Sequence, residues 1–578
     1  MKLKQNNISL GRVWRRITAT SLLALAVAFP MFTACTEADS ELVSFVDDNQ
    51  LNTPNDTVNS LIGIVNKLQK VADRTIILGE LRGELTTLTS NATLELQAIA
   101  NFTADAGNPY NNARDYYAII QNCNYFLANA DTSLVKQGRR VFEKEYAAVK
   151  TYRAWTYLQL AINYGSVPFY TQPLLAEKDA HPELFPYYTV EQMADFFVQD
   201  LAPYVDTDFP AYGSIGGLNS SRFYFPVRVV LGDLCLWAGR YREAAKYYHD
   251  FLTKQGATHP TYAAGTWWEN YEFANIGSNS FASQFSSSAT EILSFIPMET
   301  REYDGIVSRL TDIFNSTERN NYYNQATHSA AYDDLSRSQQ YVLVYPDPNT
   351  QVPDTAYASD TIHYENELMR GDLRLYSTYT YLNRPTATTT QSSIRQTCQK
   401  YRTSGTDDYL SYVALFRVQQ VYLHYAEALN RAGFPQSAFA VLKYGLWKDN
   451  IEKYISLAER EEAGELISFS QYSFDDGNTQ GIHSRGSGDA NADTTYVIPQ
   501  LPTQADSILF VEERICDELA LETAAEGQRF PDLMRLALHR NDPMFLAAKV
   551  AARNGAANID TELLNRLADK KNWYLPLE

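Results

Sequence analysis

Residues 146–168 read YAAVKTYRAWTYLQLAINYGSVP, and this stretch decides the fold. Apolar side chains recur through it and just before it at the three- and four-residue spacing of an amphipathic helix. The residues on this face are Phe142, Tyr146, Val149 and Leu160. Gly165 and Pro168 follow where a helix would end, so the pattern predicts a long helix over about 134–164. Arg153 lies on the same face, and we expect it to have a carboxylate or carbonyl partner because burying an unpaired guanidinium is very costly.

Two later segments share a second pattern, in which a glycine that ends one helix stands five residues before a small residue on the next. Gly239 precedes Ala244, and Gly433 precedes Ala438. Small residues at these points let two antiparallel helices pack closely, as in a tetratricopeptide hairpin. The chain is therefore predicted to be mostly α, with a tetratricopeptide-like scaffold of dispersed helical hairpins.

The first 34 residues are predicted to be a cleaved export signal. Five basic residues precede an apolar run over 17–29, which is too short to cross a bilayer. Cleavage between Ala34 and Cys35 would leave the thiol at the start of the mature chain, where acyl chains can anchor it to a membrane. Phe32 stands where the bacterial lipobox that this stretch resembles usually has Leu. The alternative is a soluble secreted protein with an incidental cysteine.

Helical periodicity fades in two later regions. Residues 256–407 are rich in Ser, Thr, Asn, Tyr and Pro and contain only short strand-like runs, at 291–296 and 340–345. Residues 474–503 form a second polar loop. Long irregular segments on a rigid scaffold commonly carry binding function. The predicted organisation is a signal (1–34), an acidic tether (35–55) and a single domain (56–578), whose scaffold at about 56–255 and 408–578 carries the insertion at about 256–407.

The composition excludes several classes of function. Removing the five basic residues of the signal takes the net charge from −19 to −24, and no basic stripe alternates with aromatic residues. Such a chain repels phosphate backbones, so nucleic acid is not an expected partner. No CxxC pair is present, and zinc and redox motifs are absent. The 40 Tyr, 27 Phe and 7 Trp suit both a wet helical interior and surfaces that stack on sugars or peptides.

Four segments share the order and motifs of a known protein family. They are 146–168, quoted above, 413–433 (VALFRVQQVYLHYAEALNRAG), 512–535 (EERICDELALETAAEGQRFPDLMR) and 573–577 (WYLPL). Together with the signal, they resemble the SusD/RagB outer-membrane lipoproteins of Bacteroidetes-type bacteria. The chain departs from the family at Lys443–Leu446, where an Asn-x-x-Arg-x-Arg stretch is usual, and at Thr523–Ala525, which lengthens a turn.

The resemblance implies a location, a partner and a ligand class. Such proteins are held on the extracellular face of the outer membrane by a lipid. They are similar to lids that close over a TonB-dependent, SusC-like transporter barrel. They capture an oligosaccharide or, in some branches, a peptide and hand it inward, without a cofactor.

Enzymatic motifs are missing from the sequence. There is no HExxH, GxxxxGK[ST] or GxSxG, and the eight histidines are scattered. Paired carboxylates at Asp333-Asp334 and Asp475-Asp476 leave a surface glycan hydrolase as an alternative, although adjacent acids in polar loops are usually solvated. Asp489, Asn491 and Asp493 alternate as calcium ligands do, but the glycine and glutamate of an EF-hand loop are absent. We therefore expect neither catalysis nor a bound metal.

Aromatic residues beside amides are the candidates for ligand binding, because sugar C–H faces stack on flat rings while hydroxyls need hydrogen-bond partners. The alternative for each is a ring packed under its own loop. The candidates are Trp267 and Trp268 with Asn270 and Tyr271, then Tyr322 and Tyr323, and then Tyr110. The leading hypothesis is a nutrient-binding lipoprotein that takes a glycan. A peptide-binding version of the same module and a purely structural partner scaffold are further alternatives.

Overall fold

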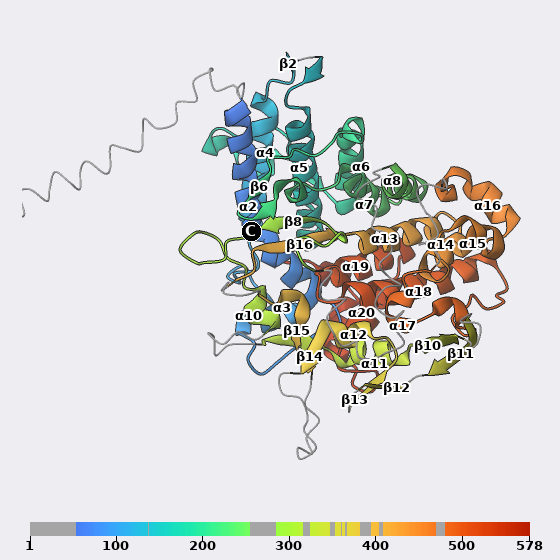
Figure 1. Cartoon of the computed structure of the whole chain (residues 1–578). Coiled ribbons are helices and arrows are strands. Elements are labelled where there is room, and N and C mark those ends of the chain that lie inside the picture. The colour runs from blue at the N-terminus through green and yellow to red at the C-terminus, as the bar shows by residue number, and fades with distance from the viewer. Residues whose placement is uncertain are drawn as a thin grey trace, which may run out of the picture. The chain divides into compact units, whose positions relative to one another are not determined.

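Helices form most of the structure, as the sequence predicts (Figure 1). The computed structural model describes residues 54–136, 138–254, 285–315, 324–346, 353–359, 361–364, 367–381, 395–403, 409–469 and 480–577. From Asn52 to Glu578 the chain is one compact unit. Within the described ranges, no helix combines the length and the apolar character that crossing a bilayer requires.

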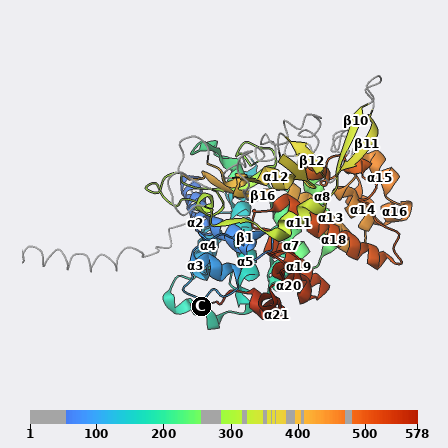
Figure 2. The ribbon, with the colours of Figure 1, turned by 90° about the horizontal axis from the view of Figure 1, so that it is seen from below.

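The scaffold consists of helices from two parts of the chain. Those of the first part are α2 (Pro54–Leu81), α3 (Leu94–Ala100), α4 (Ala113–Asn129), α5 (Glu143–Tyr164), α6 (Val190–Leu201), α7 (Val227–Trp237) and α8 (Tyr241–Lys254). Those of the second are α13 (Val418–Arg431), α14 (Pro435–Leu442), α15 (Lys448–Tyr454), α16 (Leu457–Ala463), α18 (Gln504–Thr523), α19 (Arg529–Arg540), α20 (Pro543–Ala551) and α21 (Thr561–Leu567). Consecutive helices pack on each other from α4 to α8, and α13 joins the two parts by packing on both α8 and α18. Figures 1 and 2 place α2, α4 and α5 on one side of this unit and α14–α16 on the other.

The helix α5 begins at Glu143, so the prediction of a helix from about residue 134 is wrong at its start. The preceding residues form a hairpin of β2 (Val135–Lys136) and β3 (Arg139–Arg140). Gly138, in the turn of this hairpin, has a φ of +76°, a left-handed conformation that interrupts a helix and favours glycine. The end of α5 is as predicted, at Tyr164.

Arg153 has the internal partners that the sequence leads us to expect. Its Nη2 donates to Oδ2 of Asp200 on α6 at 2.9 Å. Its Nη1 donates to Oδ1 of Asn124 on α4, also at 2.9 Å. The guanidinium therefore ties α4, α5 and α6 together while its own charge is compensated.

Both predicted helical hairpins are confirmed. Gly239 separates α7 from α8, and Gly433 separates α13 from α14, each with a positive φ. The small residues expected on the second helices, Ala244 and Ala438, are fully buried. In the first hairpin the Tyr248 ring of α8 also packs onto α7 where Gly232 has no side chain, and a Cβ there would overlap the ring.

The insertion leaves and rejoins the scaffold on a two-stranded antiparallel sheet. Strand β8 (Ile292–Pro297) pairs with β16 (Tyr412–Arg417), which leads directly into α13. β8 and β10 (Tyr341–Pro346) confirm the two strand-like runs predicted from the sequence. The other insertion elements are β9 (Ala326–His328), β11 (Pro353–Ser359), β12 (Thr361–Tyr364), β13 (Glu367–Arg370), β14 (Tyr379–Tyr381), β15 (Arg395–Cys398), α10 (Leu310–Phe314), α11 (Ala330–Ser338) and α12 (Arg374–Thr378). Short strands outside it are β1 (Thr86–Leu88), β4 (Val167–Pro168), β5 (Tyr187–Tyr188), β6 (Ser214–Ile215) and β7 (Leu218–Asn219), and the second loop contains α17 (Ser484–Ser487).

A buried ion cluster fixes the insertion and the second loop to the scaffold. Its members are Glu291, Asp372, Arg374, Lys400, Arg417, His483, Arg485, Glu518, Glu522 and Glu526. Arg374 of the insertion contacts Glu518 at 2.9 Å and Glu522 at 3.1 Å on α18. Arg485 of the second loop reaches Glu522 at 3.1 Å, and Arg417 at the end of β16 reaches it at 3.2 Å. Three separate segments therefore meet on one carboxylate, and removing one partner from such a buried cluster is strongly destabilising.

The four segments that resemble a known family are joined in two pairs through buried polar contacts. Arg417, of the second segment, donates from Nε to Glu526 of the third at 2.8 Å. Arg535 of the third donates back to Glu427 of the second at 2.9 Å. At the C-terminus, Leu575 donates its N–H to the Asn163 carbonyl of α5 at 2.9 Å. Residues of these motifs therefore make contacts that hold the scaffold together.

Candidate functional site

Most ligand-binding candidates chosen from the sequence lie outside the described residues. These are Trp267, Trp268, Asn270, Tyr271, Tyr322 and Tyr323, along with the lipidation candidate Cys35 and the acidic pair Asp475-Asp476. Tyr110 is described. The surface near it is built from other residues, which are not among the candidates predicted from the sequence.

Tyr110 lies half-buried in the turn before α4. The amides of its two asparagine neighbours bind backbone carbonyls, since Asn108 Nδ2 donates to the Glu95 carbonyl of α3 at 3.0 Å and Asn111 Nδ2 donates to the carbonyls of Asp105 and Pro576. These amides are structural and do not face a ligand. Burial and the nearby carboxylates of Asp73 and Glu95 raise the pKa of Tyr110 to about 12, so the phenol keeps its proton as a hydrogen-bond donor.

Asp73, on α2, connects the loop 299–309 of the insertion to the scaffold. Ser308 Oγ donates to Asp73 Oδ1, and the Arg309 backbone N–H donates to Oδ2, both at 2.6 Å. Desolvation of the Asp73 carboxyl raises its pKa to about 6, although both hydrogen bonds favour the carboxylate. Because the Asp73 charge also acts on Tyr110, the loop and Tyr110 belong to the same region of the molecule.

The loop 299–309 carries a fully exposed aromatic ring. Tyr303 has a relative exposure of 101%. In the same loop, the Arg309 guanidinium lies 4.8 Å from the ring centroid of Tyr409, donates to the Tyr409 hydroxyl at 2.7 Å and pairs with Glu302. We call Glu302, Tyr303, Arg309 and Tyr409 the Tyr303 surface. It combines a free flat ring with charged hydrogen-bonding groups, which is the chemistry that recognises a sugar.

Sequence reasoning missed the Tyr303 surface because it searched for rings beside amides. One signal was available, since Tyr303 precedes Asp304-Gly305, a dipeptide typical of a tight turn whose tip is exposed. The pairing of Arg309 with Tyr409 had no local signal. The two residues are 100 positions apart in the chain.

The ends of segment 316–323 lie one short helix away from the Tyr303 surface. The five-residue helix α10 begins directly after Arg309. Beyond it, the Asn324 N–H donates to the Asn315 carbonyl at 3.1 Å. The segment that carries the candidates Tyr322 and Tyr323 is therefore joined to this part of the insertion.

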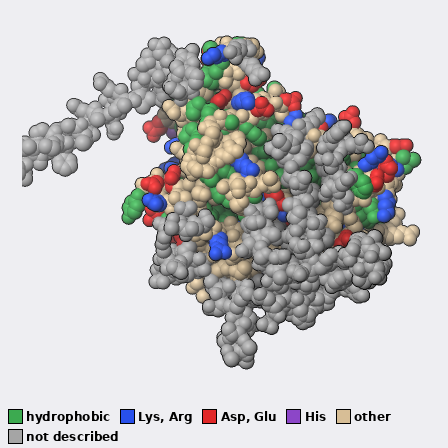
Figure 3. Space-filling model, viewed as in Figure 1, with side chains coloured by type: hydrophobic (Ala, Val, Ile, Leu, Met, Phe, Trp, Pro, Cys, Tyr) green, Lys and Arg blue, Asp and Glu red, His purple; other side chains and the backbone are tan. Residues whose placement is uncertain are grey.

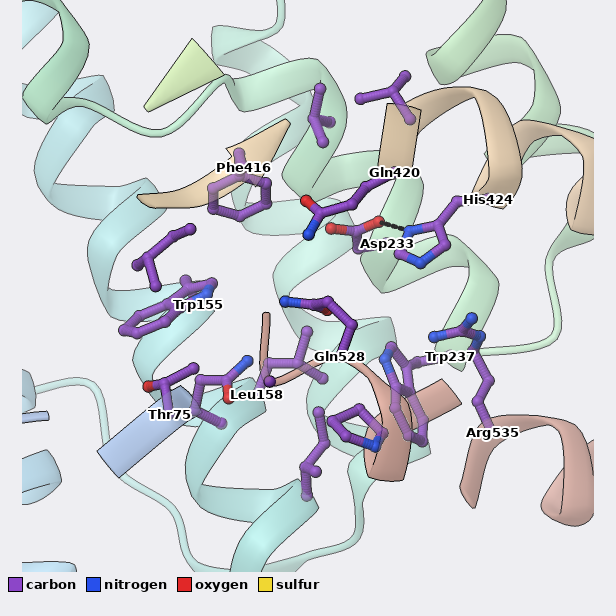
Figure 4. A pocket seen from close by; sticks show the side chains of 17 residues that line it. Thr75, Trp155, Leu158, Asp233, Trp237, Phe416, Gln420, His424, Gln528 and Arg535 are labelled. Atoms are coloured by element: carbon purple, nitrogen blue, oxygen red, sulfur yellow. Dashed lines mark hydrogen bonds and ion pairs between the residues drawn. The ribbon is translucent and has the colours of Figure 1, made fainter. Parts of the chain in front are cut away.

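A small polar cavity lies inside the scaffold, among residues of α2, α5, α7, α13 and α19 (Figure 4). Trp155 and Trp237 line it with Gln420, Gln528 and Asp233. Rings and amides suit a sugar, but small-molecule pockets usually enclose about 300–1,000 Å³. This cavity measures about 50 Å³, roughly the volume of one or two water molecules. It is therefore too small for a sugar ring.

One wall of the cavity is a buried charged chain. His424 Nδ1 lies 2.9 Å from Asp233 Oδ1 (Figure 4). Its Nε2 lies 3.4 Å from Asp532 Oδ1. Burial and the Arg535 charge oppose protonation of His424, but the two carboxylates outweigh them and raise its pKa to about 9. Tyr248 of α8 donates to the same Asp233. The imidazolium thus links α7, α8, α13 and α19, a structural role.

Acidic residues singled out in the sequence serve local structure where they are described. Asp333 pairs with Arg337 at 2.7 Å within α11. Asp493 accepts the Thr495 N–H at 2.6 Å, and Asp489 accepts a backbone N–H at 3.3 Å. Over the ranges that the structure covers, no three His, Cys, Asp or Glu side chains are grouped so that they could hold a metal ion.

Solved structures with the same fold include several from Bacteroides. A SusD superfamily protein of Bacteroides vulgatus ATCC 8482 has a TM-score of 0.56 at 14% identity, with 91% of this chain and 96% of that chain covered. One from Bacteroides fragilis NCTC 9343 has a TM-score of 0.54 at 18% identity, with the same coverages. A SusD-like carbohydrate binding protein of Bacteroides fragilis NCTC 9343 has a TM-score of 0.53 at 15% identity, covering 87% and 88%.

No protein-family profile matches the chain, and no curated protein is similar to it in sequence. The scaffold and insertion nevertheless define its class, that of helical-hairpin proteins with a loop-bearing insertion packed on the scaffold. Within that class, the chain has the SusD fold. The fold that the sequence resemblance implies is confirmed.

Proposed function

We propose that the protein is a lipid-anchored, surface-exposed outer-membrane protein that binds a glycan and delivers it to a TonB-dependent, SusC-like transporter. The observation that carries the proposal is the SusD fold, which one neighbour described as a carbohydrate binding protein shares. The Tyr303 surface supports it, because an exposed ring beside Arg309 and Glu302 offers both stacking and hydrogen bonding to a sugar.

We further propose that the ligand contacts the insertion and not the scaffold interior. The polar cavity is too small for a sugar, whereas Tyr303 is fully accessible. Tyr110 belongs to the same region through Asp73. The candidates Trp267, Trp268, Asn270 and Tyr271, and the pair Tyr322 and Tyr323, belong to the same insertion in sequence and stay proposed ligand contacts.

Binding is tested with the soluble chain of residues 36–578, since the body from Asn52 on is one compact unit. Screening against glycan and peptide panels should give saturable binding to a glycan class. Saturable binding to peptides alone would favour the peptide-binding version of the module. Binding to neither panel would contradict the proposal. Incubation with the bound glycan should leave it uncleaved, as expected of a binding protein without catalysis.

Anchoring and delivery are tested in native membranes. Cells fed an alkyne fatty acid should incorporate it into the wild-type chain and not into Cys35→Ala. The wild-type protein should be accessible to protease on intact cells and should co-purify with a transporter barrel. Release of the wild-type protein into the medium without acylation would contradict the anchor.

A further inference from the structure

Both flanks of the loop 299–309 are fixed to one face of α2. On the side that follows β8, Gln69 Nε2 donates to the Pro297 carbonyl at 2.8 Å. On the other side, Asp73 accepts from Ser308 Oγ and from the next backbone N–H, both at 2.6 Å. Gln69 and Asp73 are four residues apart in α2, so their side chains lie one turn apart on the same face of the helix. The two flanks of the loop are therefore held side by side on α2.

The tip of this loop projects from the body as a closed turn. The Glu299 N–H donates to the Ile306 carbonyl at 3.1 Å, and the Asp304 N–H donates to the Arg301 carbonyl at the same distance. Tyr303 lies within this turn and is fully exposed. Figure 3 shows hydrophobic, basic and acidic side chains together at the left edge of the view, where Figure 1 has the loop that follows β8. The position of the ring is thus set at the base of the turn.

The contacts at the base are shielded from water. Gln69 is 8% exposed, and Ser308 is fully buried. A buried hydrogen bond is strong because water does not compete for it, and removing one partner leaves the other unsatisfied. An aromatic ring that is held in place binds a sugar face without the entropy loss of ordering a loop. The base contacts can therefore affect affinity although they lie away from the exposed ring.

We propose that Gln69 and Asp73 are positioning residues, which hold the loop 299–309 on α2 so that the Tyr303 ring is already ordered when it meets a glycan. The inference rests on the proposed function, because the ligand is the glycan of that proposal. Neither residue contacts the ligand, since both act through the loop. Asp73 makes the larger contribution, because it accepts two hydrogen bonds whereas Gln69 donates one.

The first measurement needs no glycan and follows hydrogen exchange of the loop in the chain of residues 36–578. Asp73→Ala removes both acceptors, while alanine suits the helix, so exchange at the Glu299 amide should become at least about tenfold faster. Asp73→Asn is the matched control, because it removes the same charge and can keep both hydrogen bonds. Its amide oxygen accepts the Arg309 N–H, and its NH₂ group donates to Ser308 Oγ. Exchange in this variant should stay close to that of the wild type.

The second measurement is the affinity for the glycan found in the panel. Asp73→Ala should weaken binding about three- to tenfold and Gln69→Ala by less, because the loop must then be ordered on binding. Asp73→Asn should keep nearly the wild-type affinity. The Asp73→Ala change in a Tyr303→Ala background should cause no further loss, because the ring that it positions is absent. A general effect on folding would lower the affinity equally in both backgrounds.

Two results would overturn the proposal and leave the proposed function intact. Unchanged exchange in Asp73→Ala would show that Asp73 does not hold the loop. Equal losses of affinity with and without the Tyr303 ring would show that Asp73 does not act through it. Wild-type protein that binds no glycan would instead contradict the proposed function, and with it any role in glycan binding, even where exchange in Asp73→Ala is faster. Faster exchange and a loss of affinity that needs the Tyr303 ring, both prevented by Asp73→Asn, support the proposal.

Discussion

Gly527 donates its backbone N–H to the Glu80 carboxylate at 3.1 Å, across 447 positions of sequence. In the same contact, its carbonyl oxygen lies against Gly79 of α2, where an added Cβ would stand well under 3.0 Å from it. The turn before α19 and the end of α2 thus meet backbone to backbone. Because the second and first parts of the scaffold join here, this contact is suited to direct tests.

Replacing Gly79→Ala should destabilise the fold by about 2 kcal/mol or more, because the new methyl group overlaps the Gly527 carbonyl. The control is Gly63→Ala on the same helix, where no atom lies within 4 Å of the new Cβ. That variant should gain up to about 1 kcal/mol from the helix preference of alanine. Denaturant unfolding measures both, and equal stabilities would contradict the contact.

Glu80 should make stability fall as pH rises from about 4.5 to 7. Burial raises its pKa to about 7 from an ordinary 4.5, despite hydrogen bonds from Ala525 and Gly527 that favour the charged form. In this window the folded state holds a proton that the unfolded chain has lost. Glu80→Gln removes this dependence, so the stability of the variant relative to wild type should increase by up to about 3 kcal/mol between pH 4 and pH 8. A difference independent of pH would count against it.

Glu522 should have the opposite pH dependence. Burial would raise the pKa values of Glu518 and Glu522, but the neighbouring cations outweigh it and lower both to about 2. Their contribution is complete above about 4.5 and is lost as pH falls towards 2. Glu522→Gln should cost about 3–5 kcal/mol at pH 7, because three guanidiniums lose a shared partner.

The control for this change is Glu462→Gln, since Glu462 pairs with Arg242 at the surface. An exposed pair of this kind is worth less than about 1 kcal/mol. Urea unfolding of both variants at a series of pH values measures the two effects. A loss for Glu522→Gln no larger than that of Glu462→Gln would show that the cluster does not fix the insertion.

Tyr303→Ala should weaken glycan binding about tenfold, because a stacked aromatic ring is lost. Stability should not change, since the side chain is fully exposed. Tyr187→Ala is the control, because Tyr187 is also exposed, by 49%, but belongs to β5 outside the insertion. Calorimetric titration with the glycan found in the panel would compare the two, and equal affinities would remove Tyr303 from the site.

The four cysteines of the described residues should be unreactive in the native protein. Cys123, Cys235, Cys398 and Cys516 are buried and unpaired with one another. Burial raises the pKa of each thiol, to about 12 for the first three, which removes the reactive thiolate. Maleimide should label none of them at pH 7 in the chain of residues 36–578 and all four after denaturation. Rapid native labelling of any one would contradict its burial.

Local patterns in the sequence predicted the scaffold well, because helix ends and tight helix pairs have local signals. Gly239 and Gly433 marked both hairpins correctly. The start of α5 was missed because Phe142 continues the helical period, and the conformation of Gly138 overrides it. The sequence predicted that Arg153 has a carboxylate or carbonyl partner. It could not identify the residue, since Asp200 comes from another helix.

The candidate site was much less predictable than the fold. Whether a tyrosine is packed or exposed depends on what folds over it, and Tyr110 and Tyr303 differ in this respect despite similar turns. Contacts such as Arg417 with Glu526 join residues 109 positions apart, and no local pattern states them. The sequence could therefore indicate the kind of ligand contacts expected in the insertion but not which residues make them.

The hydrogen bond between Asn315 and Asn324 has a practical consequence for engineering. It holds these two residues of the insertion at a fixed separation. Elsewhere, the ion cluster fixes the insertion through Arg374 and the second loop through Arg485. A loop from another chain whose ends have this separation should therefore fit between these two asparagines. If the proposed ligand contacts lie between them, replacing that segment should change ligand preference while the surrounding frame is kept.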